Sequence, residues 1–142
     1  MKRVLSCVFA FGIVALLASM LPQAVVADDV PADRVVVMYF HRTQRCPTCL
    51  KMGSYSEEAV QSAFAQQIKA GKVEFHYIDF EDQKNAVLTR GYKVGGPTLI
   101  VAQVAGNKVA EYKNLTEIWS KVGSKTAFIE YVQSNVKDYQ KK

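Results

Sequence analysis

Four segments of the chain carry the apolar patterns of β-strands. Arg34 to Phe40 is an almost continuous apolar run, and Val73 to Phe80 alternates in part between apolar and polar residues. Thr98 to Val101 and Lys108 to Tyr112 lie on either side of an Ala105-Gly106-Asn107 turn, which is typical of an antiparallel hairpin. We therefore expect four strands.

Segments with helical periodicity lie between and after these strands. Apolar residues recur three and four positions apart from Ala59 to Ile68 and again from Ser124 to Tyr139, and Gln83 to Arg90 is typical of a short helix. Gly53 precedes the first of these patterns and interrupts a helix that would begin upstream, and Ser54 to Glu57 matches a capping box that restarts it, so we expect a kink there. The order strand, helix, strand, helix, strand, strand, helix predicts an α/β fold.

The first residues of the chain have the pattern of a secretory signal peptide. Lys2 and Arg3 precede an uncharged apolar stretch, and the small residues Val25 and Ala27 suit a signal peptidase. This predicts a signal peptide over residues 1–27 and an exported domain, periplasmic or secreted, over residues 28–142. The alternative is an uncleaved anchor formed by residues 4–26, which are numerous enough to span a bilayer.

Composition favours a single domain and argues against nucleic-acid binding. The exported part has a usual single-domain length, with no linker, repeat or low-complexity block. Lys2 and Arg3 account for two of the 18 basic residues, so 16 remain against 13 acidic ones. This excess is too small to indicate a nucleic-acid partner. The single tryptophan, Trp119, is expected to pack in the core or against a helix.

The candidate chemistry lies in Cys46-Pro47-Thr48-Cys49, directly after the first expected strand. A Cys-x-x-Cys pair on the first turn of a helix has the spacing that a disulfide requires. The N–H groups and positive dipole end of the helix stabilise the thiolate of the first cysteine. We therefore expect Cys46 to be the catalytic nucleophile and Cys49 the resolving cysteine.

The charges around the motif point the same way. Arg42, Arg45 and Lys51 surround the two cysteines, and no acidic residue lies between Arg34 and Ser56. Positive charge favours a thiolate over a thiol. The sequence thus predicts an exposed Cys46 with a lowered pKa and a more buried, less reactive Cys49.

Metal binding and a purely structural disulfide are the alternatives for this pair. Zinc requires about four ligands, and only His41 and His76 are available besides the two thiols, so no metal site is predicted. A disulfide that encloses two residues restricts the unfolded chain very little. Haem attachment is excluded on this pattern because Leu50, rather than histidine, follows Cys49.

The combination of a strand, a Cys-x-x-Cys helix start, a second strand ending in Asp79 and the later segment Tyr92 to Leu99 resembles the thioredoxin-like superfamily. The resemblance implies a central mixed four-stranded sheet flanked by helices. It also implies a cis proline at Pro97, beside the cysteines, with Gly96, Pro97 and Thr98 docking the substrate.

The chain departs from thioredoxin itself at several positions. Arg45 stands where thioredoxin has tryptophan, and the acid that thioredoxin buries on its first strand is absent. His41 is a candidate for proton transfer because its pKa is ordinarily near neutrality, and packing is the alternative role for it. Arg45 is a candidate for tuning the pKa of Cys46.

A closer local likeness is to a small exported thioredoxin-like family labelled nitrophenyl-compound nitroreductase subunit. The matching segments are Phe40-His41, Arg45 to Cys49, and Tyr55 to Val60. The label implies a redox accessory role. No flavin or nicotinamide site is visible, since Gly91 and Gly95-Gly96 form no dinucleotide fingerprint, so we expect no cofactor and no direct nitroreduction.

We therefore expect an exported thiol–disulfide oxidoreductase that acts on protein or small-molecule disulfides and dithiols. A membrane electron donor or a partner reductase would keep its cysteines in the working redox state. The alternative is a non-catalytic module, either an accessory subunit that docks a partner redox enzyme or a metal carrier. Turnover of a test disulfide would separate these two functions.

Overall fold

The structure is a computed structural model that describes residues 33–141. The signal peptide over residues 1–27, its cleavage after Ala27 and the alternative anchor over residues 4–26 lie outside the described residues. Within the described part, no helix is both long enough and apolar enough to cross a membrane.

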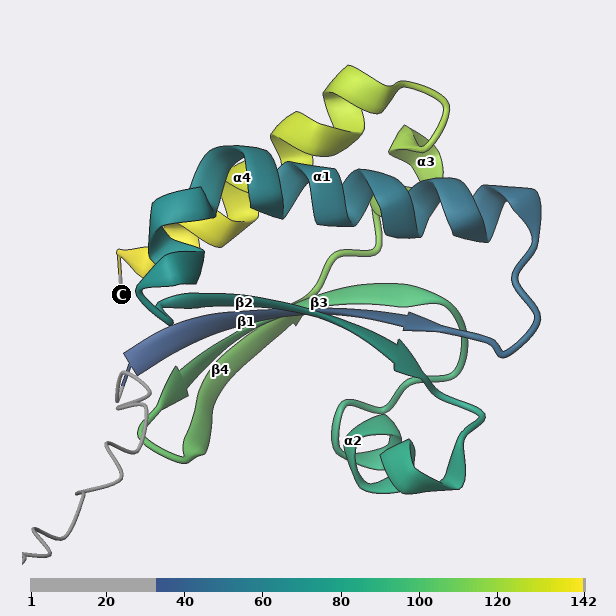
Figure 1. Ribbon diagram of the computed structural model, residues 1–142. Helices are drawn as coiled ribbons and strands as arrows, with labels where there is room; N and C mark the ends of the chain where they lie inside the picture. Colours follow the sequence, from purple (N-terminus) through teal and green to yellow (C-terminus); the bar gives the residue numbers. More distant parts are fainter. Residues whose placement is uncertain (1–32, 142) are drawn as a thin grey trace, which may run out of the picture.

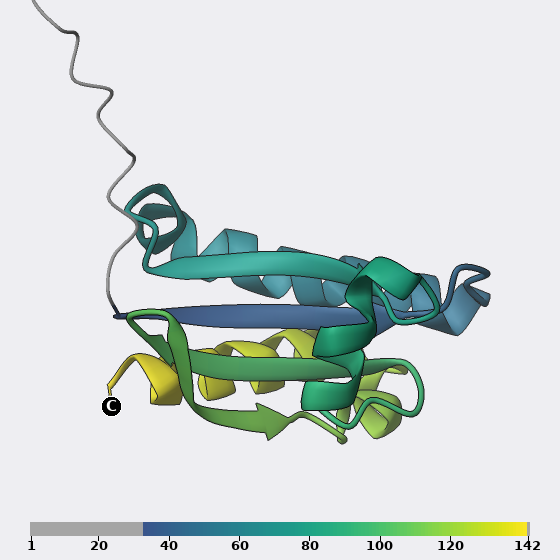
Figure 2. The same cartoon turned by 90° about the horizontal axis from the view of Figure 1, so that it is seen from below.

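A mixed sheet of four strands forms the centre of the described chain. The strands are β1 (Asp33–His41), β2 (Val73–Asp79), β3 (Thr98–Ala105) and β4 (Lys108–Asn114). Their order is β2-β1-β3-β4, with β1 parallel to β2 and antiparallel to β3, and with β3 antiparallel to β4 (Figure 2). The predicted four-stranded mixed sheet is confirmed.

Helices cover both faces of this sheet, as predicted. The long helices α1 (Pro47–Lys69) and α4 (Lys125–Gln140) lie together on one face (Figure 1). The short helix η1 (Gln83–Asn85) and α2 (Ala86–Gly91) lie on the other face. A further short helix, α3 (Ile118–Lys121), contacts α4.

The central position of β1 explains its almost continuous apolar sequence. Alternate residues face α1 and α4 on one side, among them Val37 and Tyr39, which are completely buried. The residues between them face the other side, where Phe40 is completely buried beside Phe80 and Tyr92. A strand buried on both faces needs apolar residues at every position.

The predicted kink at Gly53 is wrong, because α1 runs through Gly53 without interruption. The backbone leaves helical geometry inside α1 at Phe64 instead. Gly53 is buried against two aromatic rings, and a Cβ atom there would lie 2.9 Å from Tyr77 Cε1 and 3.0 Å from Tyr39 Cε1. This glycine therefore allows a close approach of helix and sheet rather than a break in the helix.

Replacing Gly53 with alanine is expected to destabilise the protein by about 1–3 kcal/mol. The new methyl group would overlap two ring carbons, and this overlap outweighs the higher helix propensity of alanine. Urea unfolding of the two proteins measures the change. Gly91→Ala is the matched control, because a Cβ atom at Gly91 meets nothing within 4 Å and should leave stability unchanged or raised. Equal effects of the two substitutions would contradict this explanation.

Candidate active site at the start of helix α1

The two cysteines lie where the loop after β1 enters α1. Cys46 is the N-cap residue, with an extended backbone (φ −72°, ψ 162°), and Pro47 occupies the first turn. The Cys46 Sγ atom accepts a hydrogen bond from the backbone N–H of Cys49 at 3.2 Å. Proline suits this place because it has no N–H to leave unpaired and its φ is already helical. A sulfur thus takes the capping position that serine or aspartate oxygens usually fill.

The two sulfur atoms lie side by side, one facing solvent and the other the core. Cys46 is exposed, whereas Cys49 is 6% exposed. Their Sγ atoms are 2.6 Å apart, so an approach of about half an ångström would bring them to the length of a disulfide bond. The predicted difference in burial between the two cysteines is confirmed.

The pKa values of the two thiols are shifted in opposite directions. The pKa of Cys46 is lowered, chiefly by its hydrogen bond with the Cys49 side chain and then by the hydrogen bond from the Cys49 backbone N–H. The pKa of Cys49 is raised, chiefly by burial and then by its hydrogen bond to Cys46. Cys46 is therefore the group that ionises first, as predicted.

The charge of Arg45 bears on two tyrosines near the cysteines. Its guanidinium carbon lies 5.3 Å from the centre of the Tyr77 ring. The Tyr77 hydroxyl donates to Glu57 at 3.0 Å, and burial, followed by this hydrogen bond, raises the pKa of Tyr77 to about 12. Arg45 opposes this rise, and it also opposes the rise in the pKa of Tyr39 that burial causes.

Tyr39 is a residue of the site that sequence reasoning missed. Its hydroxyl donates to the backbone oxygen of Cys49 at 2.8 Å and so ties β1 to the first turn of α1. The ring meets Tyr77 edge-on with centroids 6.0 Å apart. The only sequence signal was a phenol within an apolar strand, because a buried tyrosine hydroxyl requires a hydrogen-bond partner.

His41 packs beside these tyrosines at the end of β1. It is buried, and its ring centroid lies 6.2 Å from that of Tyr39 and 6.0 Å from that of Tyr77. Its Nδ1 atom donates to the backbone oxygen of Arg42 at 2.8 Å, which places the proton on Nδ1 when the ring is neutral. Within residues 33–141 no hydrogen bond joins His41 to either cysteine, so its role in proton transfer stays a prediction.

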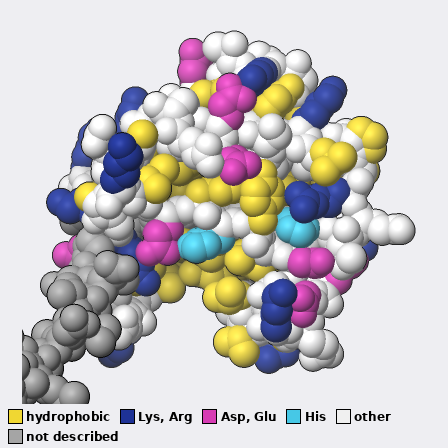
Figure 3. Space-filling model, in the orientation of Figure 1, with side chains coloured by type: hydrophobic (Ala, Val, Ile, Leu, Met, Phe, Trp, Pro, Cys, Tyr) yellow, Lys and Arg dark blue, Asp and Glu magenta, His cyan; other side chains and the backbone are white. Residues whose placement is uncertain are grey.

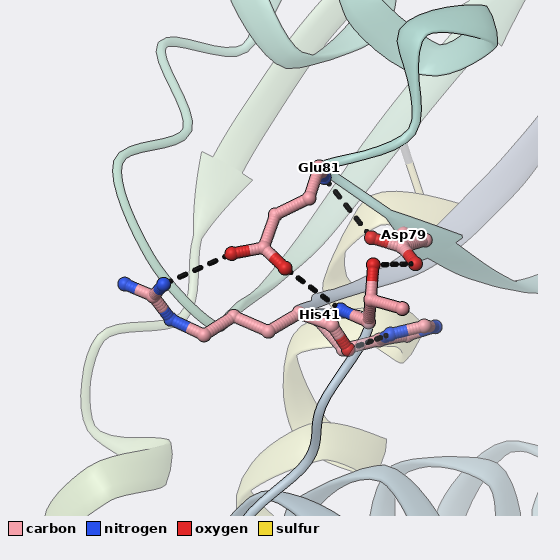
Figure 4. Close-up of polar contacts among 5 residues, drawn as sticks. His41, Asp79 and Glu81 are labelled. Carbon is pink, nitrogen blue, oxygen red and sulfur yellow. Dashed lines mark hydrogen bonds and ion pairs between the residues drawn. The ribbon is translucent and has the colours of Figure 1, made fainter.

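Two acidic residues, one at the end of β2 and one just after it, hold the loop that leads to Cys46. The Thr43 hydroxyl donates to Asp79 at 2.7 Å, and the Thr43 N–H donates to Glu81 at 3.0 Å (Figure 4). Arg42 forms an ion pair with Glu81 at 2.9 Å. The hydrogen bond from Thr43 is the main cause of the lowered pKa of Asp79. These contacts fix the loop at both the hydroxyl and the backbone of Thr43.

The segment Gly96-Pro97-Thr98 lies at the same end of the sheet as the cysteines. Thr98 pairs with Phe40 in the ladder of β1 and β3, so Pro97 comes just beyond the last pair, next to the end of β1. Thr98 is buried and donates its hydroxyl to the Asn114 side chain. None of the three residues hydrogen-bonds to either cysteine within the described chain, so substrate docking by them stays a prediction.

The predicted cis peptide bond at Pro97 is wrong for this structure. Residues 33–141 contain no cis peptide bond, so the bond between Gly96 and Pro97 is trans. The trans form is favoured by about 0.5–1 kcal/mol before proline, so a cis bond needs support from its surroundings.

Of the two expected places for Trp119, the core is wrong. Its side chain is 49% exposed, and its indole N–H donates to the backbone oxygen of Pro97 at 3.2 Å. The indole therefore covers the outside of the turn into β3 instead of filling the core. No pattern in the sequence indicates this partner, which lies 22 residues away.

No group of three or more histidine, cysteine, aspartate or glutamate side chains in the described part of the chain could hold a metal ion. Cys46, Cys49 and His41 accordingly form no such group. The structure brings together two thiols, the N–H group that caps one of them, and a loop that packs on tyrosine side chains. Two adjacent thiols of this kind can carry out thiol–disulfide exchange.

Comparisons with known proteins add little to this picture. No family model matches the chain, and no curated protein matches it. One solved structure, described as "Structure of a malarial protein", is 22% identical and covers 62% of this chain and 96% of its own, with a TM-score of 0.38. A likeness at that score carries no argument about fold or function.

The lowered pKa of Cys46 should depend on the Cys49 side chain. In a Cys7→Ser background, so that only the motif thiols react, alkylation of Cys46 by iodoacetamide should reach half its maximal rate below pH 8.5, roughly the ordinary thiol value. Cys49→Ala removes the main hydrogen bond and should move that midpoint upward, whereas Cys49→Ser keeps a donor and should move it less. If neither substitution changes the pH midpoint of alkylation, another group sets the pKa of Cys46.

The contacts of Asp79 should protect the loop that precedes Cys46 from proteolysis. Asp79→Ala removes the acceptor of the Thr43 hydroxyl, so trypsin should cleave after Arg42 and Arg45 severalfold faster. Asp82→Ala is the control, since Asp82 bonds to Lys84 and not to the loop. Cleavage rates are read by mass spectrometry of the products. Unchanged cleavage in Asp79→Ala would mean that the loop is held by other contacts.

Proposed function

We propose that this chain is an exported thiol–disulfide oxidoreductase with a thioredoxin-like fold. The observation that carries the proposal is the pair of sulfurs itself: an exposed Cys46 with a lowered pKa lies 2.6 Å from a buried Cys49 on the first turn of α1. A nucleophile must be ionised and reachable, whereas a resolving thiol must be close and protected. Cys46 has the two properties of a nucleophile, and Cys49 has the two properties of a resolving thiol.

The proposed reaction is a pair of thiol–disulfide exchanges. The Cys46 thiolate attacks one sulfur of the substrate disulfide, and the other substrate sulfur leaves as a thiolate. Cys49 loses its proton, attacks the Cys46 sulfur, closes the bond between the two cysteines and releases the second substrate thiolate. The pair loses two electrons, the substrate gains two, and the two released thiolates take up protons. The same steps in reverse oxidise a dithiol.

The chain's architecture supports the thioredoxin-like part of the proposal. The resemblance implies a mixed four-stranded sheet flanked by helices, and the mixed sheet with the thiols directly after β1 is consistent with it. Export rests on the sequence of residues 1–27. Substrates would be protein or small-molecule disulfides and dithiols, docked beside Gly96, Pro97 and Thr98, with a membrane electron donor or partner reductase to reset the pair.

The test of the proposal is a redox titration combined with a turnover assay. Purified Cys7→Ser protein is equilibrated with glutathione buffers, and the state of Cys46 and Cys49 is read by thiol trapping, while insulin reduction by dithiothreitol is followed on the same sample. We expect one two-electron midpoint and turnover that Cys46→Ser abolishes. Cys49→Ser should instead accumulate a mixed disulfide with the substrate, because the resolving step is lost.

A non-catalytic module gives a different result in the same assays. The cysteines would then cycle in the titration with no acceleration of insulin reduction, or they would stay reduced and retain a metal through purification. Either result would replace the oxidoreductase with an accessory or metal-binding role.

A further inference from the structure

Arg45, the residue before the proposed nucleophile, carries a positive charge that no acidic side chain of the described residues neutralises. It precedes Cys46 in the chain, both residues are exposed, and no acidic side chain within residues 33–141 forms an ion pair with it. The neighbouring Arg42, by contrast, is paired with Glu81 at 2.9 Å. Lys and Arg side chains gather next to a histidine below the start of α1, at the end of the molecule where β1 leads into that helix (Figure 3).

The guanidinium of Arg45 is held in place by its contact with an aromatic ring. It lies 5.3 Å from the centre of the Tyr77 ring. That ring is itself fixed, because it meets Phe75 and Tyr39 edge-on and its hydroxyl donates to Glu57. Within residues 33–141 the Arg45 N–H groups form no hydrogen bond or ion pair, so they are available to a ligand while the guanidinium lies over the ring.

A fixed guanidinium with free N–H groups is a binding site for a carboxylate. Its planar fork matches the two oxygens of a carboxylate, and bonds of this kind combine charge with direction. Arg45 and Cys46 are consecutive residues, whose Cα atoms are about 3.8 Å apart, so a substrate that reaches the Cys46 sulfur passes close to Arg45. Glu57 also contacts Tyr77, but it accepts a hydrogen bond from the Tyr77 hydroxyl and forms no ion pair with Arg45.

We propose that Arg45 selects the substrate: the disulfides that Cys46 attacks carry a carboxylate close to the reacting sulfur, and Arg45 binds it. This inference rests on the proposed function and adds the chemical class of the substrate to it. Binding leaves the reaction unchanged, since the Cys46 thiolate still forms a bond to one substrate sulfur while the other leaves as a thiolate. The reduced cysteine pair supplies both electrons, so one turnover needs no further reductant.

The test compares three small disulfides of similar size and different charge. Dithiodipropionate is acidic, bis(hydroxyethyl) disulfide is neutral and cystamine is basic. Fully reduced Cys7→Ser protein is mixed with each in single-turnover experiments, and the second-order rate constant for loss of the Cys46 and Cys49 thiols is measured. Each variant is compared by its ratio of acidic to neutral rate constants, because this ratio cancels any change in the intrinsic reactivity of Cys46.

Arg45→Gln should lower the ratio of acidic to neutral rate constants roughly two- to fivefold, the range expected for one exposed ion pair. It should raise the relative rate of cystamine. Arg45→Lys keeps the charge but not the planar fork and should give an intermediate ratio. Arg42→Gln is the matched control and should leave the ratio unchanged, because Glu81 already neutralises Arg42. Salt near 1 M, where the Debye length is about 3 Å, should shrink the difference between the wild type and Arg45→Gln.

Two further substrates distinguish the source of the carboxylate. Oxidised glutathione represents a small acidic disulfide, and a pair of disulfide-linked peptides with Glu or Gln beside the cysteine represents a protein. A preference for Glu over Gln that disappears in Arg45→Gln would assign the carboxylate to a protein substrate. An Arg45-dependent preference confined to glutathione would assign it to a small thiol compound.

The outcomes separate this inference from the proposed function. If all disulfides react but the ratio of acidic to neutral rate constants is the same in the wild type and in Arg45→Gln, Arg45 does not select the substrate. The proposed oxidoreductase function would be unaffected by that result. An equal fall in Arg42→Gln would also overturn selection by Arg45, since general positive charge would then explain the preference. If no disulfide reacts with Cys46, the proposed function is wrong and this inference falls with it.

Discussion

The close approach of α1 to the sheet at Gly53 is the constraint on which the thiol site depends. Two tyrosine rings occupy the place where any side chain at residue 53 would have to lie. Because the helix comes so near, the hydroxyl of Tyr39 reaches the backbone oxygen of Cys49 at 2.8 Å. That bond sets the first turn of the helix against β1, which buries one sulfur and leaves the other outside.

The division between a buried and an exposed sulfur then produces the division of their pKa values. Cys49 loses water around its sulfur, which disfavours its thiolate, and it keeps its proton as a donor to Cys46. Cys46 receives that hydrogen bond and the one from the Cys49 N–H, and both favour its thiolate. The two thiols therefore titrate as a pair. Burial raises the pKa of Tyr39, so its hydroxyl stays protonated and keeps its bond to Cys49 across the range in which Cys46 ionises.

The parts of the structure that follow from local pattern were predictable. A central strand buried on both faces gives a continuous apolar run, and two cysteines one turn apart after such a strand indicate a helix cap. The capping role of Ser124, whose side chain accepts from the Ala127 N–H, likewise agrees with a helix expected to begin at that residue.

What could not be predicted depends on contacts between distant segments. In the sequence, Gly53 suggests a break in the helix. In the structure, the rings of Tyr39 and Tyr77 lie so close that only glycine fits at this position. The partner of the Trp119 indole is a backbone oxygen at Pro97, which no periodicity indicates. Thr43 and Asp79 lie 36 residues apart, and only the parallel pairing of β1 with β2 brings the end of one beside the end of the other.

The pKa of Cys46 and the charge near it depend on different residues, and this bears on the proposed chemistry. A thiolate stabilised in the reduced protein favours oxidation of the substrate, by about 30 mV for each unit of pKa below the working pH. Here that stabilisation comes first from hydrogen bonds with Cys49, whereas the charge of Arg45 lies over Tyr77. In the proposed reaction, the redox potential and the charge of the preferred substrate would thus be set by different groups. A change at residue 45 could alter which disulfides are chosen while the pair keeps most of its oxidising strength.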